Sequence, residues 1–232
     1  MNELILFGSV VLIFGFVLLA WRFFGKAGLF AMTAAAAILS NIEVLILVNA
    51  FGMEQTLGNV LFAANFLITD ILSENVGKKE ANTAVFLGLF VSVFFVILTG
   101  SWLLYTPSEN DWAMPSVRAI FSATPRTVLA SMSVYAVSQL FDVWLYHRLW
   151  AFTERKSGSR KRFLWLRNNG ATLLSQLVNT VLFTLAAFAG REGYDGALLL
   201  QIMLSSYAIY IVTSLLDTPA VYIARRIREK QT

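Results

Sequence analysis

The chain of 232 residues contains no cysteine and a single histidine, His147. The missing thiols exclude disulfides, cysteine nucleophiles and cysteine-ligated metals, and one imidazole argues against a histidine-based zinc or iron site. Charged residues make up only 14% of the chain, whereas 57% of its residues are hydrophobic. A soluble core could not bury so much apolar surface, so this composition is typical of a membrane protein with several spans. We predict neither a metal nor a cofactor.

The formal net charge of +4 does not by itself indicate a nucleic-acid-binding protein. The basic residues cluster beside apolar stretches, where membrane topology explains them better. The N-terminal run Met1–Ala20 has no basic start and no small-residue cleavage site before Trp21. We therefore expect a retained span there rather than a signal peptide.

Windows of about 20 apolar residues predict seven membrane spans. Placing every basic cluster in the cytoplasm requires seven crossings with the N-terminus outside, which supports the short third stretch that hydropathy leaves ambiguous. The expected spans are Leu4–Phe24, Gly28–Ala50, Gly58–Ser73, Ala81–Leu104, Thr127–Tyr146, Gly170–Phe188 and Ala197–Tyr222. We thus expect an all-α, polytopic helix bundle in the plasma membrane with a cytoplasmic C-terminus.

Two further features of the chain predict local structure. Three prolines and scattered aromatic residues between Tyr105 and Arg126 indicate a short helix lying at the outer membrane interface. Pro219 lies within the last span, where we expect it to break the helix and free carbonyl groups.

Three aspartates, Asp70, Asp142 and Asp217, lie in separate apolar stretches that hold no Lys or Arg. With a rise of about 1.5 Å per residue, each lies roughly 9 to 12 Å inside the nearest basic residue, so the three share nearly one plane. Even the lowest insertion scales assign an ionised side chain at a helix centre a cost of about 2.5 to 3.5 kcal/mol. Such residues mark a path for ions or polar solutes, and we expect these three to line it.

Polar and aromatic side chains accompany the aspartates at helical spacing. For most of them an ordinary interhelical hydrogen bond is the alternative reading, at about 0.6 kcal/mol per contact. Glu74 is either part of the site or a solvated interfacial acid, and Glu43 is either a gate or a structural partner of a neighbouring helix. The other candidate binding residues are Phe66, Gln139, Asn169, Gln176 and Asn179.

Carboxylates without basic partners favour cations, protons or neutral molecules that carry several N–H donors. A carboxylate accepts two parallel N–H bonds well, and the Watson–Crick edge of guanine offers such a pair. Amides such as Gln139 and Gln176 complement a ring carbonyl or nitrogen, and Phe66 could stack on a planar base. Anionic solutes fit poorly.

Several strings resemble signatures of the queuosine precursor transporter family, also called the vitamin uptake transporter family. Their order and spacing cover the chain from about Gly58 to its end, and the first span falls outside the resemblance. The matching strings are Thr69–Glu74 with Gly77–Ala81, Thr124–Arg126 with Ser138, Gln139 and Asp142, Arg167–Asn169 with Ser175, Gln176 and Thr180, and Leu216–Pro219.

The resemblance implies an importer of 7-deazaguanine bases: the cyano base, the aminomethyl base or queuine, which are precursors of a modified tRNA nucleoside. It also implies a six-helix core (residues 27–232) similar to the substrate-binding subunits of energy-coupling-factor transporters, preceded by an extra helix (residues 1–26). The motif residues carried over are Asp70, Glu74, Gln139, Asp142, Gln176 and Asp217. One position departs from the pattern, because Asn179 stands where the family usually has Asp.

Two other functions stay open from the sequence. The chain could be the substrate-binding subunit of an ATP-driven transporter, with the basic stretch from Arg148 to Arg167 docking its partner. An intramembrane aspartyl-type enzyme is the weaker alternative, because neither a Gly-x-Gly-Asp signature nor a nucleophile–base set is visible. We expect membrane lipid and a small molecule as partners, and the sequence leaves a homo-oligomer open.

Overall fold

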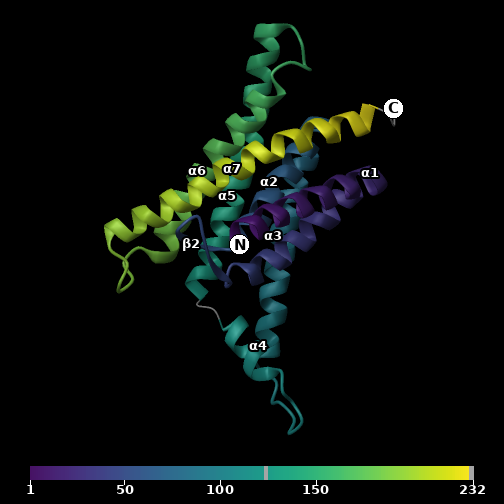
Figure 1. Cartoon of the computed structure of the whole chain (residues 1–232). Coiled ribbons are helices and arrows are strands. Elements are labelled where there is room, and N and C mark those ends of the chain that lie inside the picture. Colours follow the sequence, from purple (N-terminus) through teal and green to yellow (C-terminus); the bar gives the residue numbers. More distant parts are fainter. Residues whose placement is uncertain (123–124, 230–232) are drawn as a thin grey trace.

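The computed structural model describes residues 1–122 and 125–229, and most of them are helical (Figure 1). Each of the seven expected spans contains a helical segment, and α1 holds the first two. The elements in chain order are α1 (Asn2–Glu43), β1 (Leu47–Ala50), β2 (Met53–Thr56), α2 (Gly58–Asn75), α3 (Lys78–Trp102), α4 (Met114–Phe121), α5 (Pro125–Ser157), α6 (Leu164–Phe188) and α7 (Gly196–Glu229). The protein is a multi-pass membrane helix bundle, as predicted.

Length and composition identify the helices that could cross a membrane. Within the described residues, α1, α3, α6 and α7 are long and apolar enough to cross a membrane. Helices α2 and α5 are not in this group, although both lie in the bundle with the others. Sixteen residues of α2 are buried, so this helix can carry more polar residues than a helix in contact with lipid.

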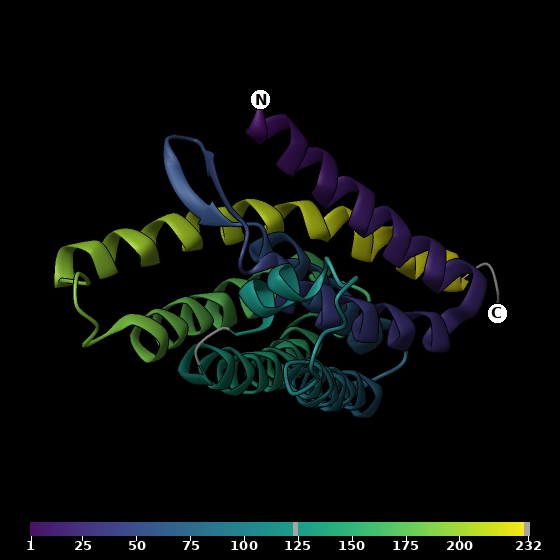
Figure 2. The same ribbon diagram turned by 90° about the horizontal axis from the view of Figure 1, so that it is seen from below.

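Helix α1 turns back on itself at Gly25. This residue has φ 56° and ψ −136°, a combination that residues with a Cβ rarely adopt. A Cβ on Gly28 would lie 2.4 Å from the Ala20 carbonyl oxygen, so the return segment also needs glycine there. Figure 2 shows the two segments folding back beside each other. Helix α1 therefore consists of two helical segments joined at a non-helical residue, Gly25.

A β-hairpin follows α1, where the sequence predicted that the second span would continue to Ala50. Leu47 pairs with Thr56, and the two-residue turn between the strands is Phe51–Gly52, both with positive φ. Positive φ at both central residues is what a type I′ hairpin turn requires. The Phe51 N–H donates to Glu3, and the Asn2 amide donates to the Asn49 carbonyl. The N-terminus therefore ties down the hairpin, and the predicted helical end was wrong.

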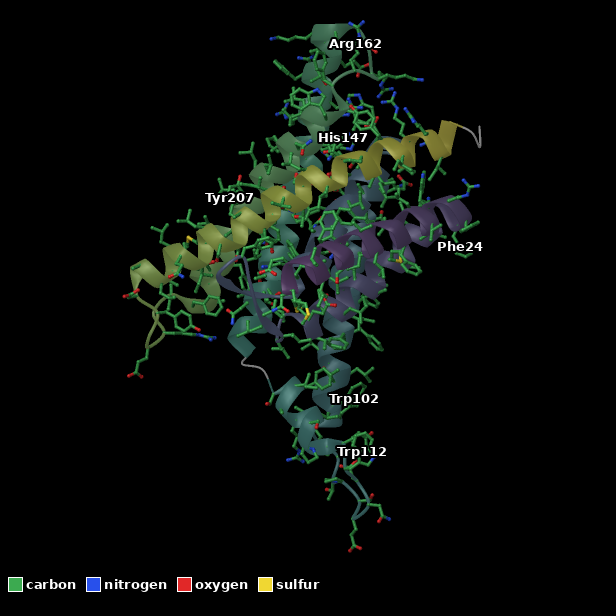
Figure 3. All side chains as sticks on the ribbon, viewed as in Figure 1. Phe24, Trp102, Trp112, His147, Arg162 and Tyr207 are labelled. Carbon is green, nitrogen blue, oxygen red and sulfur yellow. The ribbon has the colours of Figure 1, made fainter. Side chains whose placement is uncertain are left out.

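The bundle has two distinct ends. The hairpin end carries the N-terminus, the two strands and the α6–α7 connection. The basic end carries the α2–α3 turn, the α5–α6 connection and the last turns of α7. Gly77 makes the α2–α3 turn with φ 135° and ψ 173°, a region essentially restricted to glycine. Figure 3 labels Arg162 at one extreme of the molecule and Trp112 at the other.

Two local predictions have different outcomes. A short helix, α4, does form in the connection after α3, and its Phe121 ring contacts Phe95 and Trp102. The expected break at Pro219 is absent, because α7 continues through this residue. A proline removes only one helical hydrogen bond, and the neighbouring Ala220 and Val221 are buried in the core.

The first segment of α1 packs against the rest of the bundle. Its buried face includes Val10, Phe14 and Val17, which belong to the main hydrophobic core. Trp21 donates its indole N–H to the Ala224 carbonyl of α7 at 2.9 Å. The division of the chain after residue 26 stays a prediction.

Candidate functional site

The structure brings the three aspartates together in the middle of the bundle. Asp70, Asp142 and Asp217 come from α2, α5 and α7, and each is at most 2% exposed. Their carboxyl groups are close enough to interact electrostatically. We call these three residues the carboxylate cluster.

Helix α6 supplies a donor to each aspartate. The Thr172 hydroxyl donates to Asp70 at 3.0 Å, and the Ser175 hydroxyl donates to Asp142 at 2.6 Å. The Asn168 amide donates to Asp217, also at 2.6 Å. The two bonds of 2.6 Å are as short as charge-assisted hydrogen bonds, whereas the Thr172–Asp70 bond has an ordinary length. None of the ion pairs in the described part of the chain involves an aspartate of the cluster.

Unsatisfied polar atoms remain around the cluster. Among the described residues, four such buried atoms without a hydrogen-bond partner are Asp70 Oδ1, Asp142 Oδ2, Gln139 Nε2 and Gln176 Oε1. A carboxylate oxygen accepts hydrogen bonds but cannot donate them, so each of these two unpaired oxygens is suited to a ligand that brings N–H or O–H donors. An unpaired buried polar group costs about 1 to 3 kcal/mol, which a suitable ligand would recover.

The amide candidates Gln139 and Gln176 and the aromatic candidate Phe66 are all buried. Gln139 and Gln176 are fully buried, and Gln139 accepts a hydrogen bond from Thr69 at 3.3 Å. Phe66 is also fully buried and packs edge-on against Phe62 at 5.4 Å. Phe62, one turn toward the hairpin end, lines a cavity that Phe66 does not reach.

The two asparagine candidates of α6 lie in different places. Asn179 faces the hairpin-end cavities, and its Oδ1 accepts a bond from Ser138 at 3.4 Å. Asn169 lies near the basic end, where its amide donates to Thr218 at 2.7 Å. It links α6 to α7 rather than joining the cluster.

Glu74 does not lie with the aspartates as a free acceptor. It makes a bidentate ion pair with Arg167, in which Nη2 lies 2.7 Å from Oε1 and Nε lies 2.9 Å from Oε2. The Tyr146 hydroxyl donates to the same carboxylate at 2.8 Å. The Arg167 side chain is fully buried and that of Glu74 is 4% exposed. The alternative of a solvated interfacial acid is therefore wrong, because α5 and α6 cover Glu74.

Glu43 ends α1 at the hairpin end. It is half-buried, and its backbone carbonyl accepts a hydrogen bond from Thr56. Its role, as a gate or as a structural partner of a neighbouring helix, stays a prediction.

Two adjoining cavities open at the hairpin end. The larger has a volume of about 380 Å³ and the smaller about 70 Å³. They share Asn59, Asn179, Phe183 and Tyr210, and neither is lined by a charged side chain. The Tyr210 hydroxyl donates to Asn59 Oδ1 at 3.0 Å, whereas Asn59 Nδ2 is buried without a partner. We call this pair of cavities the hairpin-end vestibule.

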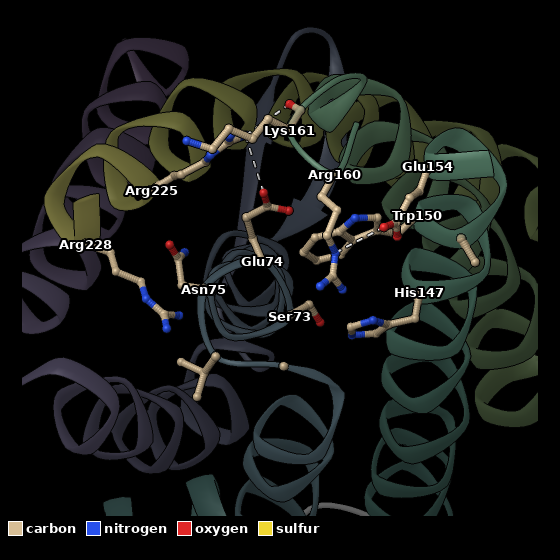
Figure 4. A pocket seen from close by; sticks show the side chains of 13 residues that line it. Ser73, Glu74, Asn75, His147, Trp150, Glu154, Arg160, Lys161, Arg225 and Arg228 are labelled. Carbon is tan, nitrogen blue, oxygen red and sulfur yellow. Dashed lines mark hydrogen bonds and ion pairs between the residues drawn. The ribbon is translucent and has the colours of Figure 1, made fainter. Parts of the chain in front are cut away.

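A cavity of about 500 Å³ opens at the basic end, against Ser73, Glu74, His147 and Trp150 (Figure 4). We call it the basic pocket. Neither it nor the hairpin-end vestibule is lined by an aspartate of the cluster, as far as the described residues show. The carboxylate cluster is thus enclosed between two cavities.

Several residues of this arrangement were not predicted as site residues. Arg167 was read as part of a basic loop, and Asn59 and Tyr210 were not singled out for binding. The Arg167-Asn168-Asn169 string was the available signal, because two polar side chains open the apolar α6 beside an arginine.

Comparison with known proteins addresses the identity of the chain. A profile of the family described as "putative vitamin uptake transporter" matches residues 56–224. A Bacillus subtilis (strain 168) protein named "probable queuosine precursor transporter" is 36% identical over 211 residues, which are 91% of this chain and 89% of that protein. The chain belongs to this transporter family.

A more distant relative agrees with this assignment. The Escherichia coli (strain K12) "queuosine precursor transporter" is 25% identical over 177 residues, covering 76% of this chain and 75% of the relative. No solved structure matches the chain. The resemblance seen in the sequence motifs is confirmed, and the fold described above is that of a family member.

Proposed function

We propose that the protein imports 7-deazaguanine precursors of queuosine and binds the base at the carboxylate cluster. The names of both relatives support queuosine precursors as the cargo. The observation that carries the proposal is the set of unpaired atoms at the cluster: two carboxylate oxygens and an amide N–H group. A deazaguanine edge brings N–H donors to the carboxylates and a carbonyl acceptor to the amide.

One face of α2 supports a route through the bundle. Asn59, Phe62, Phe66, Asp70 and Glu74 follow one another at intervals of three or four residues, which places them along one side of the helix. The first two line the hairpin-end vestibule, and the last lines the basic pocket. The base would enter over the amide and aromatic groups and leave past the ion pair.

Two contacts close this route. On the hairpin side, the Phe62 ring meets those of Tyr135 and Tyr210 at 5.9 and 6.1 Å. On the basic side, the buried Glu74–Arg167 pair joins α2 to α6. We propose that the contact between the aromatic rings opens to admit the base and that the Glu74–Arg167 ion pair breaks to release it. The two barriers would then open one after the other.

The proposed orientation places the basic end in the cytoplasm, following the positive-inside rule, with the N-terminus outside. The extra helix (residues 1–26) would then cover the six-helix core at α7. The proposal does not require an ATP-driven partner. Uptake by the purified chain in liposomes would support this, whereas binding without uptake would indicate dependence on another subunit.

Uptake of the radiolabelled cyano and aminomethyl bases tests the function directly. The host is a strain that neither makes nor imports the precursor, and queuosine in its tRNA is the second readout. We expect uptake by the wild type and by Glu109→Gln, which makes the same carboxyl-to-amide change on an exposed loop. We expect its loss in Asp142→Asn. Full uptake by Asp142→Asn and Asp217→Asn would remove these residues from the mechanism.

The two bases also separate two uses of the cluster. The aminomethyl base carries a cation that a carboxylate would pair with, and the cyano base is neutral. If the carboxylates act by accepting ring N–H groups, both bases compete for uptake with similar strength. If they act as a counter-ion, only the aminomethyl base competes.

A further inference from the structure

The basic pocket carries more positive than negative charge. Among the described residues, its lining includes four cationic side chains, Arg160, Lys161, Arg225 and Arg228, and two acidic ones, Glu74 and Glu154. Glu74 is already engaged by Arg167 at 2.7 Å. Figure 4 shows the cationic side chains distributed around the cavity, on the α5–α6 connection and on α7. The pocket therefore favours an anionic occupant.

Two ion pairs at the rim have longer N···O distances than the buried Glu74–Arg167 pair. Arg225 lies 3.5 Å from Glu74, and Arg160 lies 3.5 Å from Glu154. The Arg160 side chain is 74% exposed, and such surface pairs contribute about 0 to 1 kcal/mol. A ligand with several oxygen atoms could therefore engage the Arg160 guanidinium group at the cost of only a weak pair with Glu154.

Three buried polar atoms without partners belong to residues that line this pocket. They are Ser73 Oγ, His147 Nε2 and Trp150 Nε1. The indole can only donate a hydrogen bond, and the serine hydroxyl can donate as well. The Trp150 ring is held by cation–π contacts with Arg167 at 4.3 Å and Arg160 at 5.5 Å. Its N–H donor is therefore fixed beside the cavity rather than free to turn toward solvent.

We propose that the basic pocket binds a phosphate-type anion, with Trp150 and Ser73 donating to its oxygen atoms and Arg160 and Arg228 compensating its charge. This site is distinct from the carboxylate cluster and does not depend on the proposed function. A deazaguanine fits it less well, because the base brings N–H donors to a pocket that already has an excess of donors. The same chemistry occurs in a free cytoplasmic phosphate compound and in the headgroup of an anionic lipid.

The test uses the full-length purified protein in nanodiscs of neutral phosphatidylcholine. Thermal unfolding is followed as inorganic phosphate is added, with potassium chloride at equal ionic strength as the reference. A second set of nanodiscs contains phosphatidylglycerol and no phosphate. A rise of the midpoint with phosphate identifies a soluble anion, and a rise only with phosphatidylglycerol identifies a lipid headgroup.

Three variants decide whether the rise comes from this pocket. Trp150→Phe removes the N–H donor and keeps an aromatic ring, and Arg228→Gln removes a charge at the rim. Both should lose the rise. Arg118→Gln, on α4 at the other extreme of the molecule, should keep it. The proposal is overturned if chloride stabilises the wild type as much as phosphate and phosphatidylglycerol do, or if both pocket variants retain the full rise.

Discussion

The two cavities that enclose the carboxylate cluster differ in chemistry. The hairpin-end vestibule is lined by aromatic, hydroxyl and amide groups and has no charged side chain. The basic pocket is lined by six ionised side chains and is closed toward the cluster by a buried ion pair. A neutral planar base is better suited to the hairpin-end vestibule than to the basic pocket. The difference therefore agrees with the proposed entry of the base at the hairpin-end vestibule.

The largest effect is expected at the Glu74–Arg167 pair. Arg167→Met leaves Glu74 as an uncompensated buried charge, so we expect a loss of about 3 to 5 kcal/mol in the free energy of unfolding. The double variant Glu74→Gln/Arg167→Met should lose less than Arg167→Met alone. Chemical denaturation of the purified protein measures both.

Lys26→Gln serves as the control for the ion pair. It removes an exposed pair with Glu80 whose atoms lie 3.5 Å apart, so its effect should stay below about 1 kcal/mol. Equal losses of unfolding free energy in Arg167→Met and Lys26→Gln would show that the buried pair at the basic end contributes no more than a pair on a charged surface.

The next effect concerns the cluster itself. Asp142→Asn replaces an acceptor oxygen by a donor facing Asp70, so we expect initial uptake rates to fall about tenfold to a hundredfold, the equivalent of about 1.5 to 3 kcal/mol. Ser175→Ala, which removes only the hydroxyl that donates to Asp142, should cause a smaller decrease. Uptake unchanged in Asp142→Asn would show that the base does not pass the cluster.

A smaller effect is expected at the hairpin-end vestibule. Tyr210→Phe removes the hydroxyl that donates to Asn59, so the amide loses its orientation and KM for uptake should rise about tenfold or less. The maximal rate should stay close to that of the wild type, because the cluster is intact. Tyr105→Phe makes the same change at an exposed tyrosine and should leave KM unaltered. A fall in the maximal rate with unchanged KM would contradict an entry role.

The smallest effect concerns His147, which lies beyond the expected span at the basic end. Burial, followed by the charges of Lys78 and Arg167, lowers the pKa of His147 to about 4. Between about pH 4 and 6.5 the unfolded chain binds a proton that the folded chain does not, so stability should fall as the pH is lowered through this range. Unfolding midpoints at pH 7 and pH 5 should differ less in His147→Phe than in the wild type. An identical difference would show that His147 contributes nothing to it.

The helices and the convergence of the aspartates could be predicted because they depend on short-range patterns. Apolar length and basic clusters located all seven helical segments, and counting helical rise from the basic residues placed the three aspartates at one level. The hairpin was missed because Leu47–Ala50 is mostly apolar and its sequence is equally compatible with a helix end. Its strand pairing depends on a turn at Phe51–Gly52 and on contacts with the N-terminus.

The ion pair shows why other parts of the site could not be predicted. Glu74 and Arg167 are 93 residues apart, and each alone reads as an ordinary charge near a membrane surface. Asn59 and Tyr210, 151 residues apart, likewise read as isolated polar residues in apolar helices. Only the packing of α2 against α5, α6 and α7 gives these side chains their partners.

The sequence by itself determined that this is a multi-pass membrane protein of a particular transporter family, because the length of the spans, the placement of charges and the order of the motifs are properties of the linear sequence. The tertiary structure decided which polar groups meet: Asp70 with Thr172 across 102 residues, and Glu74 with Arg167 rather than with the aspartates. The physical reason is that a buried polar group must find a partner, and in a helix bundle that partner comes from another helix whose position no local pattern specifies.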